Sequence, residues 1–382
     1  MDRSATVLEL LRLRPRSSRS DLAGGSGLSE ATISRVIARL RRERYVEETL
    51  SDQPVFGRPP TLARIRHGVA HVVGVDAGGR HLRGLAVDLD GTVGEADEGQ
   101  VLDRGGDGVA SVLAGLVRRL SSRTGTPCLA LAVGASGIVD RQAGRVVLSP
   151  DLPGLVNVDL VADLEKELGI AVVIDNDDLL SAVGEAAVGG AAGCRNVVFL
   201  SLGFGLGAGV LVGGRPLRGS DAAAGAIAYL APGPLGDRAS GRAIAERYRQ
   251  QAGDAGGGDL DAGEVFSRAR AGDGAAAQVV ADAVRALADA VVNVAALLDP
   301  EVIVLGGGLM NNREEILGPV SERLARAVPY PPRLTVSSLG ADAVARGASL
   351  LALTMADRLL ATRFGRQPGP PEPGRVGALE LI

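Results

Sequence analysis

The chain has 382 residues, of which 46% are hydrophobic and 23% are charged. This balance is ordinary for a packed globular protein and excludes disorder as the main state, and the length allows two or three domains. No stretch approaches the roughly 18 apolar residues that a membrane span needs. The charged N-terminus has no apolar core of a secretory signal. We therefore expect a cytoplasmic protein that does not contact a membrane.

Charge and composition limit the partners that the chain can recognise. Residues 1–68 hold 13 arginines and 8 acidic residues, whereas the remainder holds 28 basic and 37 acidic residues. A basic arm on an acidic body predicts that any nucleic-acid contact is confined to the first segment. Aromatic residues make up 2% and Trp is absent, so binding of single strands by base stacking is not expected. With two cysteines, Cys128 and Cys194, neither a disulfide framework nor a four-cysteine zinc site can form.

The first seventy residues have the pattern of a helix-turn-helix. We expect a short helix within 5–13, a second that is capped by Ser20 and ended by the glycines of 24–27, and a third that is capped by Ser29. The third helix has apolar residues at i, i+3, i+4 and i+7, which predicts one buried face. These residues are Ile33, Val36, Ile37 and Leu40.

The opposite face of the third helix carries polar and basic side chains. The N-terminal turns of a recognition helix face base edges in the major groove, so Thr32, Ser34 and Arg35 are predicted base contacts. Arg39, Arg41 and Arg42 lie further along the helix and are predicted phosphate contacts. The simpler alternative is a helical hairpin whose arginine face is only solvated.

Two strand-like segments follow, 45–50 and 61–65, and the turn-rich stretch between them predicts a β-wing. Arg58 lies in Gly57-Arg58-Pro59-Pro60, an extended segment with one cation that suits a narrow minor groove. Together with the helices, these segments predict a winged helix-turn-helix domain over 1–68. The combined pattern favours this domain over the solvated hairpin.

Three glycine-rich turns, each after a predicted strand, mark the body of the chain. Their separations indicate the phosphate and adenosine loops of an actin-like ATPase fold, in which two α/β lobes enclose a nucleotide. The residues concerned are Asp76, Gly78 and Gly79 in the first turn, Gly203, Gly205 and Gly207 in the second, and Gly306 and Gly307 in the third. Long helices are expected over 275–298 and 341–360.

The sequence resembles the ROK family of repressors, open reading frames and sugar kinases over roughly residues 5–360. The motifs are Asp76-Ala77-Gly78-Gly79, Ile174-Asp175-Asn176-Asp177, and 293–300 leading into Gly306-Gly307-Gly308. The winged domain before them resembles the repressor branch. The resemblance implies an N-terminal lobe over 70–190, completed by a C-terminal helix at about 341–362, and a C-terminal lobe over 191–340. The Pro- and Gly-rich tail, 363–382, is predicted to be disordered.

Departures from the family's kinase motifs bear on activity. Arg80 and Phe204 stand where the phosphate loops usually have Thr, and Ala226 and Tyr229 replace a sugar-binding Glu and a zinc-binding His. The segment 233–241 contains no thiol, so we expect neither structural zinc nor any other metal or cofactor, and we do not expect ATP to bind. Asp177 matches the kinases' catalytic base, and we interpret it as a vestigial one, because phosphoryl transfer depends on positioned phosphate-binding groups.

The kinase cleft serves related repressors as a sensor, which implies effector contacts at matching positions. These are Gly134, Asp151, Asn176, Asp177 and Tyr229. Because Ala226 removes an acceptor, the ligand is a modified sugar, a less polar molecule, or none.

We therefore predict a DNA-binding transcriptional regulator, a repressor, with a catalytically inactive body. A homodimer or tetramer would present recognition helices to a palindromic double-stranded operator. A sugar-like effector would then shift the spacing of the winged domains. The alternatives are an ATP-dependent sugar kinase with a regulatory DNA-binding arm, and a regulator that needs no ligand.

Overall fold

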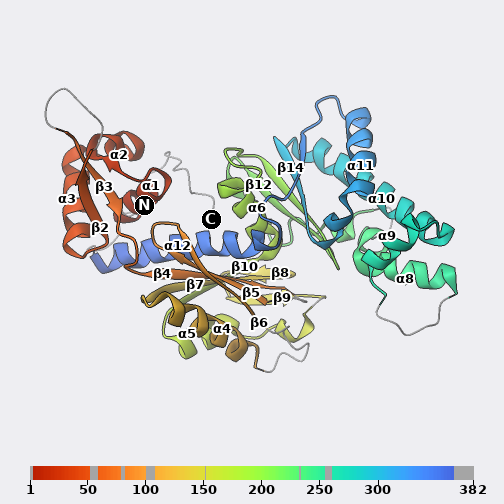
Figure 1. Ribbon diagram of the computed structural model, residues 1–382, viewed down its shortest axis with the longest axis horizontal. Helices are drawn as coiled ribbons and strands as arrows, with labels where there is room; N and C mark the ends of the chain where they lie inside the picture. The colour runs from red at the N-terminus through yellow and green to blue at the C-terminus, as the bar shows by residue number, and fades with distance from the viewer. Residues whose placement is uncertain are drawn as a thin grey trace. The chain divides into compact units, whose positions relative to one another are not determined.

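The computed structural model describes residues 3–51, 59–78, 82–99, 108–150, 152–231, 234–253 and 260–364 (Figure 1). The chain forms two units, one of residues 1–175 and 345–382 and the other of residues 176–344. The first unit therefore contains the winged domain, the N-terminal lobe and most of the C-terminal helix. The second unit begins at Asn176, earlier than the predicted boundary at 190, because helix α6 (Asp177–Val188) packs on the strands that follow it.

The N-terminal domain has the predicted winged helix-turn-helix fold. Its third helix buries Ile33, Val36, Ile37 and Leu40, as the periodicity predicts. The three strands form a sheet of order β1-β3-β2, and β3 is antiparallel to both neighbours. The elements are α1 (Arg3–Leu13), β1 (Ser17–Ser18), α2 (Arg19–Ser26), α3 (Glu30–Arg42), β2 (Val46–Leu50) and β3 (Thr61–Ile65).

The second helix differs from its prediction at both ends. Its N-cap is Ser18, not Ser20, and Ser18 and Asp21 form a capping box that satisfies two amides of the first turn. The predicted glycine break is wrong at Gly24 and Gly25, which lie within α2, and correct at Gly27, the C-cap residue, whose φ is 68°. A Cβ on Gly25 would lie 3.3 Å from Leu10 Cδ2, so glycine allows α2 to pack closely on α1.

The N-terminal lobe is a five-stranded sheet with helices on both faces. Its order is β10-β7-β4-β5-β6, with β4 to β6 antiparallel and β7 parallel to β4. Helices α4 and α5 cover one face and α12 the other (Figure 1). The elements are β4 (His71–Ala77), β5 (Leu82–Asp88), β6 (Val93–Gly99), α4 (Val109–Thr124), β7 (Cys128–Ala135), β8 (Ile138–Asp140), β9 (Arg145–Leu148), the 3-10 helix η1 (Pro153–Leu155), α5 (Leu160–Leu168), β10 (Ala171–Asn176) and α12 (Ala343–Phe364).

The second unit repeats this strand arrangement. Its sheet has the order β13-β12-β11-β14-β15, in which β11 to β13 are antiparallel and β14 and β15 are parallel to β11. Two lobes of the same topology confirm the predicted actin-like architecture. Besides α6, the elements are β11 (Val197–Leu202), β12 (Leu206–Val212), β13 (Arg215–Pro216), η2 (Ile227–Tyr229), α7 (Gly236–Ala239), α8 (Gly241–Ala252), α9 (Ala262–Arg270), α10 (Gly274–Leu298), β14 (Val302–Gly306), η3 (Gly308–Asn312), α11 (Arg313–Ala327), β15 (Arg333–Val336) and η4 (Gly340–Asp342).

The two predicted long helices are present as α10 and α12, within a few residues of their expected bounds. Phe364 ends α12, so the first two residues of the predicted tail are helical and 365–382 lie outside the described residues. No helix in the described part of the chain is long and apolar enough to cross a membrane.

Candidate functional site

The solvent-facing side of α3 begins with an ordered polar turn. Ser29 caps the helix by accepting from the Thr32 amide, and its hydroxyl lies 2.9 Å from Thr32 Oγ1. Arg35 is exposed and donates from Nη2 to Thr32 Oγ1 at 3.3 Å and from Nε to the Ala31 carbonyl at 3.3 Å. The structure thus brings together two predicted base contacts, Thr32 and Arg35, beside half-buried Ser34.

The remaining predicted DNA contacts differ in their surroundings. Arg42 is exposed at the end of α3, with a 3.9 Å ion pair to Glu43. Arg39 is half-buried, and its Nη2 donates to the buried Ser4 hydroxyl of α1. This guanidinium therefore joins α1 to α3. The prediction that Arg39 contacts a phosphate did not include this structural role. Arg58 lies outside the described residues.

A buried carboxylate lies behind α3, and no sequence motif pointed to it. Glu48 of β2 accepts from Arg19 at 2.8 Å and from Arg41 at 2.7 Å, and its side chain is 6% exposed. The two arginines belong to α2 and α3, and the one on α3 is the predicted phosphate contact Arg41, whose side chain is 61% exposed. Because one carboxylate holds both helices, their angle to the β2–β3 ribbon is fixed by charge-assisted hydrogen bonds.

The second unit brings two of the predicted glycine turns together. Strands β11 and β14 are parallel neighbours that pair Ser201 with Gly306, so the turns that follow them lie at the same edge of the sheet. A Cβ on Gly306 would overlap the Phe199 ring, and one on Gly307, whose φ is 87°, would overlap the Leu202 carbonyl. Close backbone packing therefore accounts for glycine at both positions.

The turn of Gly203 and Gly205 accepts hydrogen bonds from the first amides of the neighbouring helix α8. Gly241 N donates to the Gly203 carbonyl at 2.8 Å, and Arg242 N donates to the Phe204 carbonyl at 3.2 Å. Ala243 N donates to the Ser240 hydroxyl at 3.1 Å. The first amides of a helix are the groups that usually bind a phosphate, and in α8 three of them are already bonded within the chain.

The carboxylates at the start of α6 lie next to this turn. Asn176 caps the helix through Leu179 N at 2.9 Å, and its amide donates to Asp177 Oδ1 at 3.1 Å. A Cβ on Gly207 would overlap the Asp178 carboxylate, which places Asp178 against the strand after the turn. Asn176 and Asp177, two predicted effector contacts, are thus joined by a hydrogen bond.

The other predicted body residues are distributed over both units. Tyr229, in the second unit, is 64% exposed in η2. In the first unit, Asp76 of β4 pairs with Gly134 of β7 across the parallel ladder, and Gly78 follows β4. Two predicted residues, Gly79 and Asp151, lie outside the described residues, as does Arg80.

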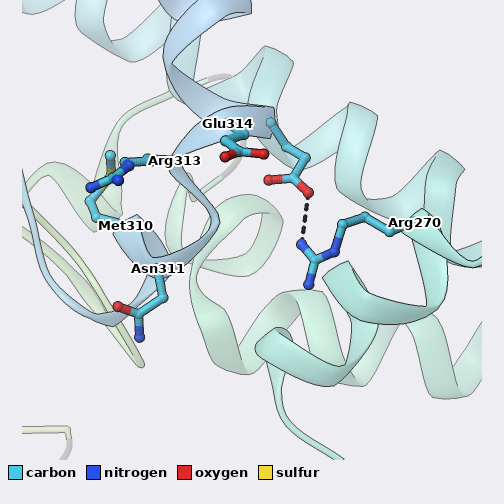
Figure 2. A pocket seen from close by; sticks show the side chains of 6 residues that line it. Arg270, Met310, Asn311, Arg313 and Glu314 are labelled. Carbon is cyan, nitrogen blue, oxygen red and sulfur yellow. Dashed lines mark hydrogen bonds and ion pairs between the residues drawn. The ribbon is translucent and has the colours of Figure 1, made fainter.

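A polar hollow of about 410 Å³ adjoins the segment after the third glycine turn. Figure 2 shows the side chains of Arg270, Arg313 and Glu314 around it. Arg270 donates to Glu315 at 2.7 Å. The lining residues are Arg270, Met310, Asn311, Arg313, Glu314 and Glu315. No sequence motif pointed to Arg270, which reaches this place from α9.

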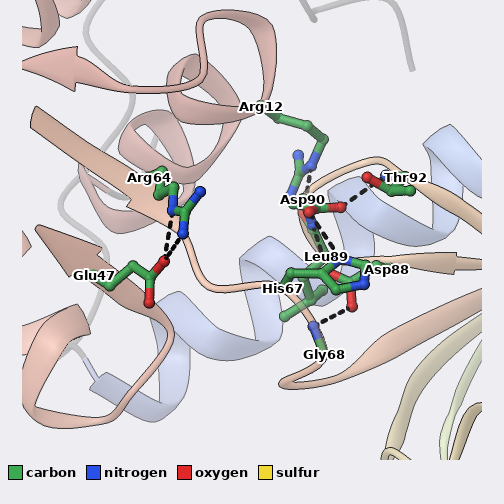
Figure 3. Close-up of polar contacts among 9 residues, drawn as sticks. All are labelled: Arg12, Glu47, Arg64, His67, Gly68, Asp88, Leu89, Asp90 and Thr92. Carbon is green, nitrogen blue, oxygen red and sulfur yellow. Dashed lines mark hydrogen bonds and ion pairs between the residues drawn. The ribbon is translucent and has the colours of Figure 1, made fainter. Parts of the chain in front are cut away.

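A histidine and two aspartates meet where the winged domain joins the N-terminal lobe (Figure 3). His67 Nδ1 lies 3.0 Å from Asp90 Oδ2 and 3.8 Å from Asp88 Oδ1. Their ligand atoms lie close enough together to hold a metal ion, and no sequence motif pointed to this grouping. The carboxylates also accept from the amides of Gly68, Asp90 and Thr92, and this hydrogen-bonded turn accounts for their arrangement without an ion.

The pKa values of His67 and His71 are shifted in opposite directions. The hydrogen bond to Asp90 and the charge of Asp88 raise the pKa of His67, whereas burial lowers the pKa of His71. His67 therefore stabilises the fold most below its unfolded pKa of about 6.5, and that stability is lost as pH rises through the folded pKa. His71 stabilises the fold above about 6.5 and loses its contribution as pH falls.

Imidazole resonances followed by NMR from pH 5 to 9 check this prediction. We expect His67 to titrate above 6.5 and His71 below it, with His67→Gln identifying the first resonance. Asp90→Asn is the control that should return the His67 midpoint toward its ordinary value. A single shared midpoint for both histidines would contradict the prediction.

Comparison with known proteins connects these features to a family. The sequence profile of the ROK family matches residues 72–355, and that of the IclR helix-turn-helix domain matches residues 1–49. The bifunctional enzyme NanE/NanK of Brucella melitensis is 39% identical over 216 residues, which cover 55% of this chain and 39% of that protein. The chain thus spans well under half of that relative. The xylose repressor of Caldicellulosiruptor bescii is 28% identical over 219 residues, covering 56% of this chain and 54% of that protein.

Solved structures share the fold. A ROK family transcriptional regulator, a homologue of the Escherichia coli MLC protein, superposes with a TM-score of 0.80 at 22% identity, covering 95% of this chain and 98% of that chain. A ROK family glucokinase from Streptomyces griseus, in complex with glucose and AMPPNP, has a TM-score of 0.64 at 25% identity, covering 74% and 99%. The likeness to the regulator includes the N-terminal domain, whereas the glucokinase covers a smaller share of this chain.

Proposed function

The chain belongs to the ROK family, and from this premise we propose that it is a DNA-binding transcriptional regulator that acts as a repressor. The observation that carries the proposal is the exposed Arg35, hydrogen-bonded to Thr32, on the third helix of a winged domain joined to a ROK body. An arginine at this position can bond both O6 and N7 of guanine. The xylose repressor and the MLC-like regulator among its relatives support this function.

The body is proposed to bind a ligand without phosphorylating it. Phosphoryl transfer requires donors aimed at the transferred phosphate. Phe204 supplies no hydroxyl, and the adjoining amides of Gly241 and Arg242 already donate to the turn. We propose that the body needs neither ATP nor another cofactor to bind its ligand.

A sugar-like effector is proposed to contact Asn176, Asp177 and Tyr229. The two neighbouring polar groups at the start of α6 offer hydrogen bonds to hydroxyls, and the exposed Tyr229 ring offers a face on which a sugar can stack. In a homodimer, an effector-linked change in the spacing of the two winged domains would weaken binding to a palindromic operator.

Capture of fragmented genomic DNA by the purified protein tests the regulatory function. The experiment is run at fixed physiological salt, because phosphate contacts alone give salt-dependent binding to any sequence. Enrichment of a palindromic site is expected, with release of that site on addition of a metabolite extract. Uniform recovery of all sequences would contradict specific regulation, and retention of the site in every extract would contradict the sensor function.

The alternative activity, an ATP-dependent sugar kinase, is supported by the glucokinase relative. A coupled assay of ADP release with hexoses and amino sugars separates the two functions, and we expect no sugar-dependent release. Turnover that Asp177→Asn abolishes would contradict the proposal of an inactive body. Turnover that survives this substitution would indicate a contaminating kinase.

A further inference from the structure

A buried ion pair connects the winged domain to the C-terminal helix. Arg12 of α1 donates from Nη1 to Asp357 Oδ2 at 3.0 Å and from Nη2 to Asp357 Oδ1 at 2.9 Å. Its Nε donates to the Leu89 carbonyl at 2.9 Å. The two side chains are 10% and 5% exposed. We call Arg12, Leu89 and Asp357 the α12 joint.

The geometry of the α12 joint constrains orientation as well as distance. A guanidinium is planar, and here three of its donors reach acceptors on two different elements, α12 and the turn between β5 and β6. Rotation of α1 against the lobe would break at least one of these bonds. Burial raises the pKa of Asp357 and the Arg12 charge opposes that rise, so each partner depends on the other.

The same turn is bonded to the linker that follows the winged domain (Figure 3). Gly68 N donates to Asp88 Oδ2 at 2.7 Å, and Leu89 N donates to the Ala70 carbonyl at 3.2 Å. Gly91, with φ of 92°, approaches so closely that a Cβ would lie 3.1 Å from Arg12 Cγ. The turn of residues 88–91 is therefore held by α1 on one side and by the linker on the other.

The start of α12 is anchored as well, within the second unit. Residues 337–339 precede this helix, and the fully buried Glu185 of α6 accepts from Ser337 Oγ at 2.5 Å and from Leu339 N at 3.0 Å. Helix α12 then runs without interruption for 22 residues to Phe364. Buried contacts therefore hold α12 on both sides, Glu185 before its start within the second unit and Arg12 near its end within the first.

We propose that the α12 joint fixes the orientation of the DNA-binding domain, with Arg12 as its positioning residue. This inference rests on the proposed function only where DNA is concerned. Two recognition helices can match half-sites of one fixed separation only if each domain is held in a defined direction. A domain attached by the linker alone would sample many directions and lose that preorganisation.

Distances between spin labels in the free protein test the joint without DNA. Labels are placed at Ser20→Cys on α2 and Ser122→Cys on α4, both exposed, in a background of Cys128→Ala and Cys194→Ser. We expect one narrow distance distribution in this parent and a broad one in Arg12→Ala and in Asp357→Asn. Arg358→Ala, an exposed neighbour on α12, is the matched control and should stay narrow.

Arg12→Lys keeps the positive charge and removes the planar guanidinium. This variant is a second test in case Arg12→Ala fails to fold. It is expected to give a broader distribution than the parent while retaining a cooperative thermal transition. If Arg12→Ala and Arg12→Lys both keep the narrow distribution of the parent, the proposal is overturned.

A second measurement uses DNA probes in which the spacing of two half-sites is varied. The parent should prefer one spacing, and Arg12→Ala should lose about tenfold in affinity at that spacing, while affinity for a single half-site is unchanged. Equal loss on single and double half-sites would contradict a positioning role. If the parent binds no specific DNA, the proposed function fails. The spin-label distances then still test whether the α12 joint fixes the orientation of the N-terminal domain.

Discussion

Arg35→Ala is expected to weaken binding to the specific DNA site by roughly tenfold to a hundredfold per half-site, which corresponds to about 1–3 kcal/mol for a lost bidentate base contact. Arg35 is the exposed cation of the first turns of α3, and Thr32 orients its guanidinium through the bond to Nη2. The substitution should also reduce discrimination at one base pair, because a base contact supplies sequence preference.

The salt dependence of binding separates this role from a phosphate contact. Arg35→Ala should leave the slope of log affinity against log salt nearly unchanged, whereas Arg42→Ala should reduce it by about one and weaken all sequences alike. Fluorescence anisotropy with specific and scrambled probes measures both effects. Arg326→Ala, on α11 and with its side chain 78% exposed, is the control that should change neither.

An unchanged affinity and an unchanged base preference for Arg35→Ala would move the recognition surface away from the first turns of α3. The wing would then be the next segment to test, starting with Arg58. A uniform loss on all probes would instead assign Arg35 to a phosphate.

Local patterns in the sequence were sufficient to predict most of the fold. The buried stripe of α3 follows from the spacing of Ile33, Val36, Ile37 and Leu40, since a period of 3.6 residues leaves little choice of which face is covered. The strands after which the glycine turns occur were also predictable, because short apolar runs ended by glycine are typical of buried strands. Where two patterns competed, as at Gly25, close packing on Leu10 outweighed the low helix propensity of glycine.

Contacts between residues that lie far apart in the sequence leave no local pattern from which they can be predicted. Arg12 and Asp357 are 345 positions apart, and nothing local to either one indicates the partner. The same holds for Glu48, whose two arginines lie on different helices. Charged residues in a sequence are expected to be solvated, so neither the buried Arg12–Asp357 pair nor the buried Glu48 carboxylate could be found before the chain was folded.

Gly74→Ala is expected to destabilise the first unit severely, because β4 and α12 are too close for a side chain at this position. A Cβ on Gly74 would overlap the Ala345 carbonyl and the Ser349 amide of α12. Ser349 is 2% exposed, and its hydroxyl already donates to the Ala345 carbonyl at 2.7 Å. These are backbone atoms of a helix, so relief requires movement of α12 as a whole.

The cost should therefore reach or exceed the upper end of ordinary overpacking, about 3 kcal/mol, and lower the melting temperature by roughly 6–12 °C. Scanning calorimetry of Gly74→Ala checks this, and loss of the folded protein would also agree with it. Gly115→Ala is the matched control, because its Cβ would meet nothing closer than Arg119 Nη1 at 3.8 Å. In the interior of α4 that change should stabilise by about 0.5–1 kcal/mol. A melting temperature for Gly74→Ala equal to that of the parent would mean that α12 can separate from β4 at little cost, and α12 would then be too loosely seated for the α12 joint to orient the DNA-binding domain.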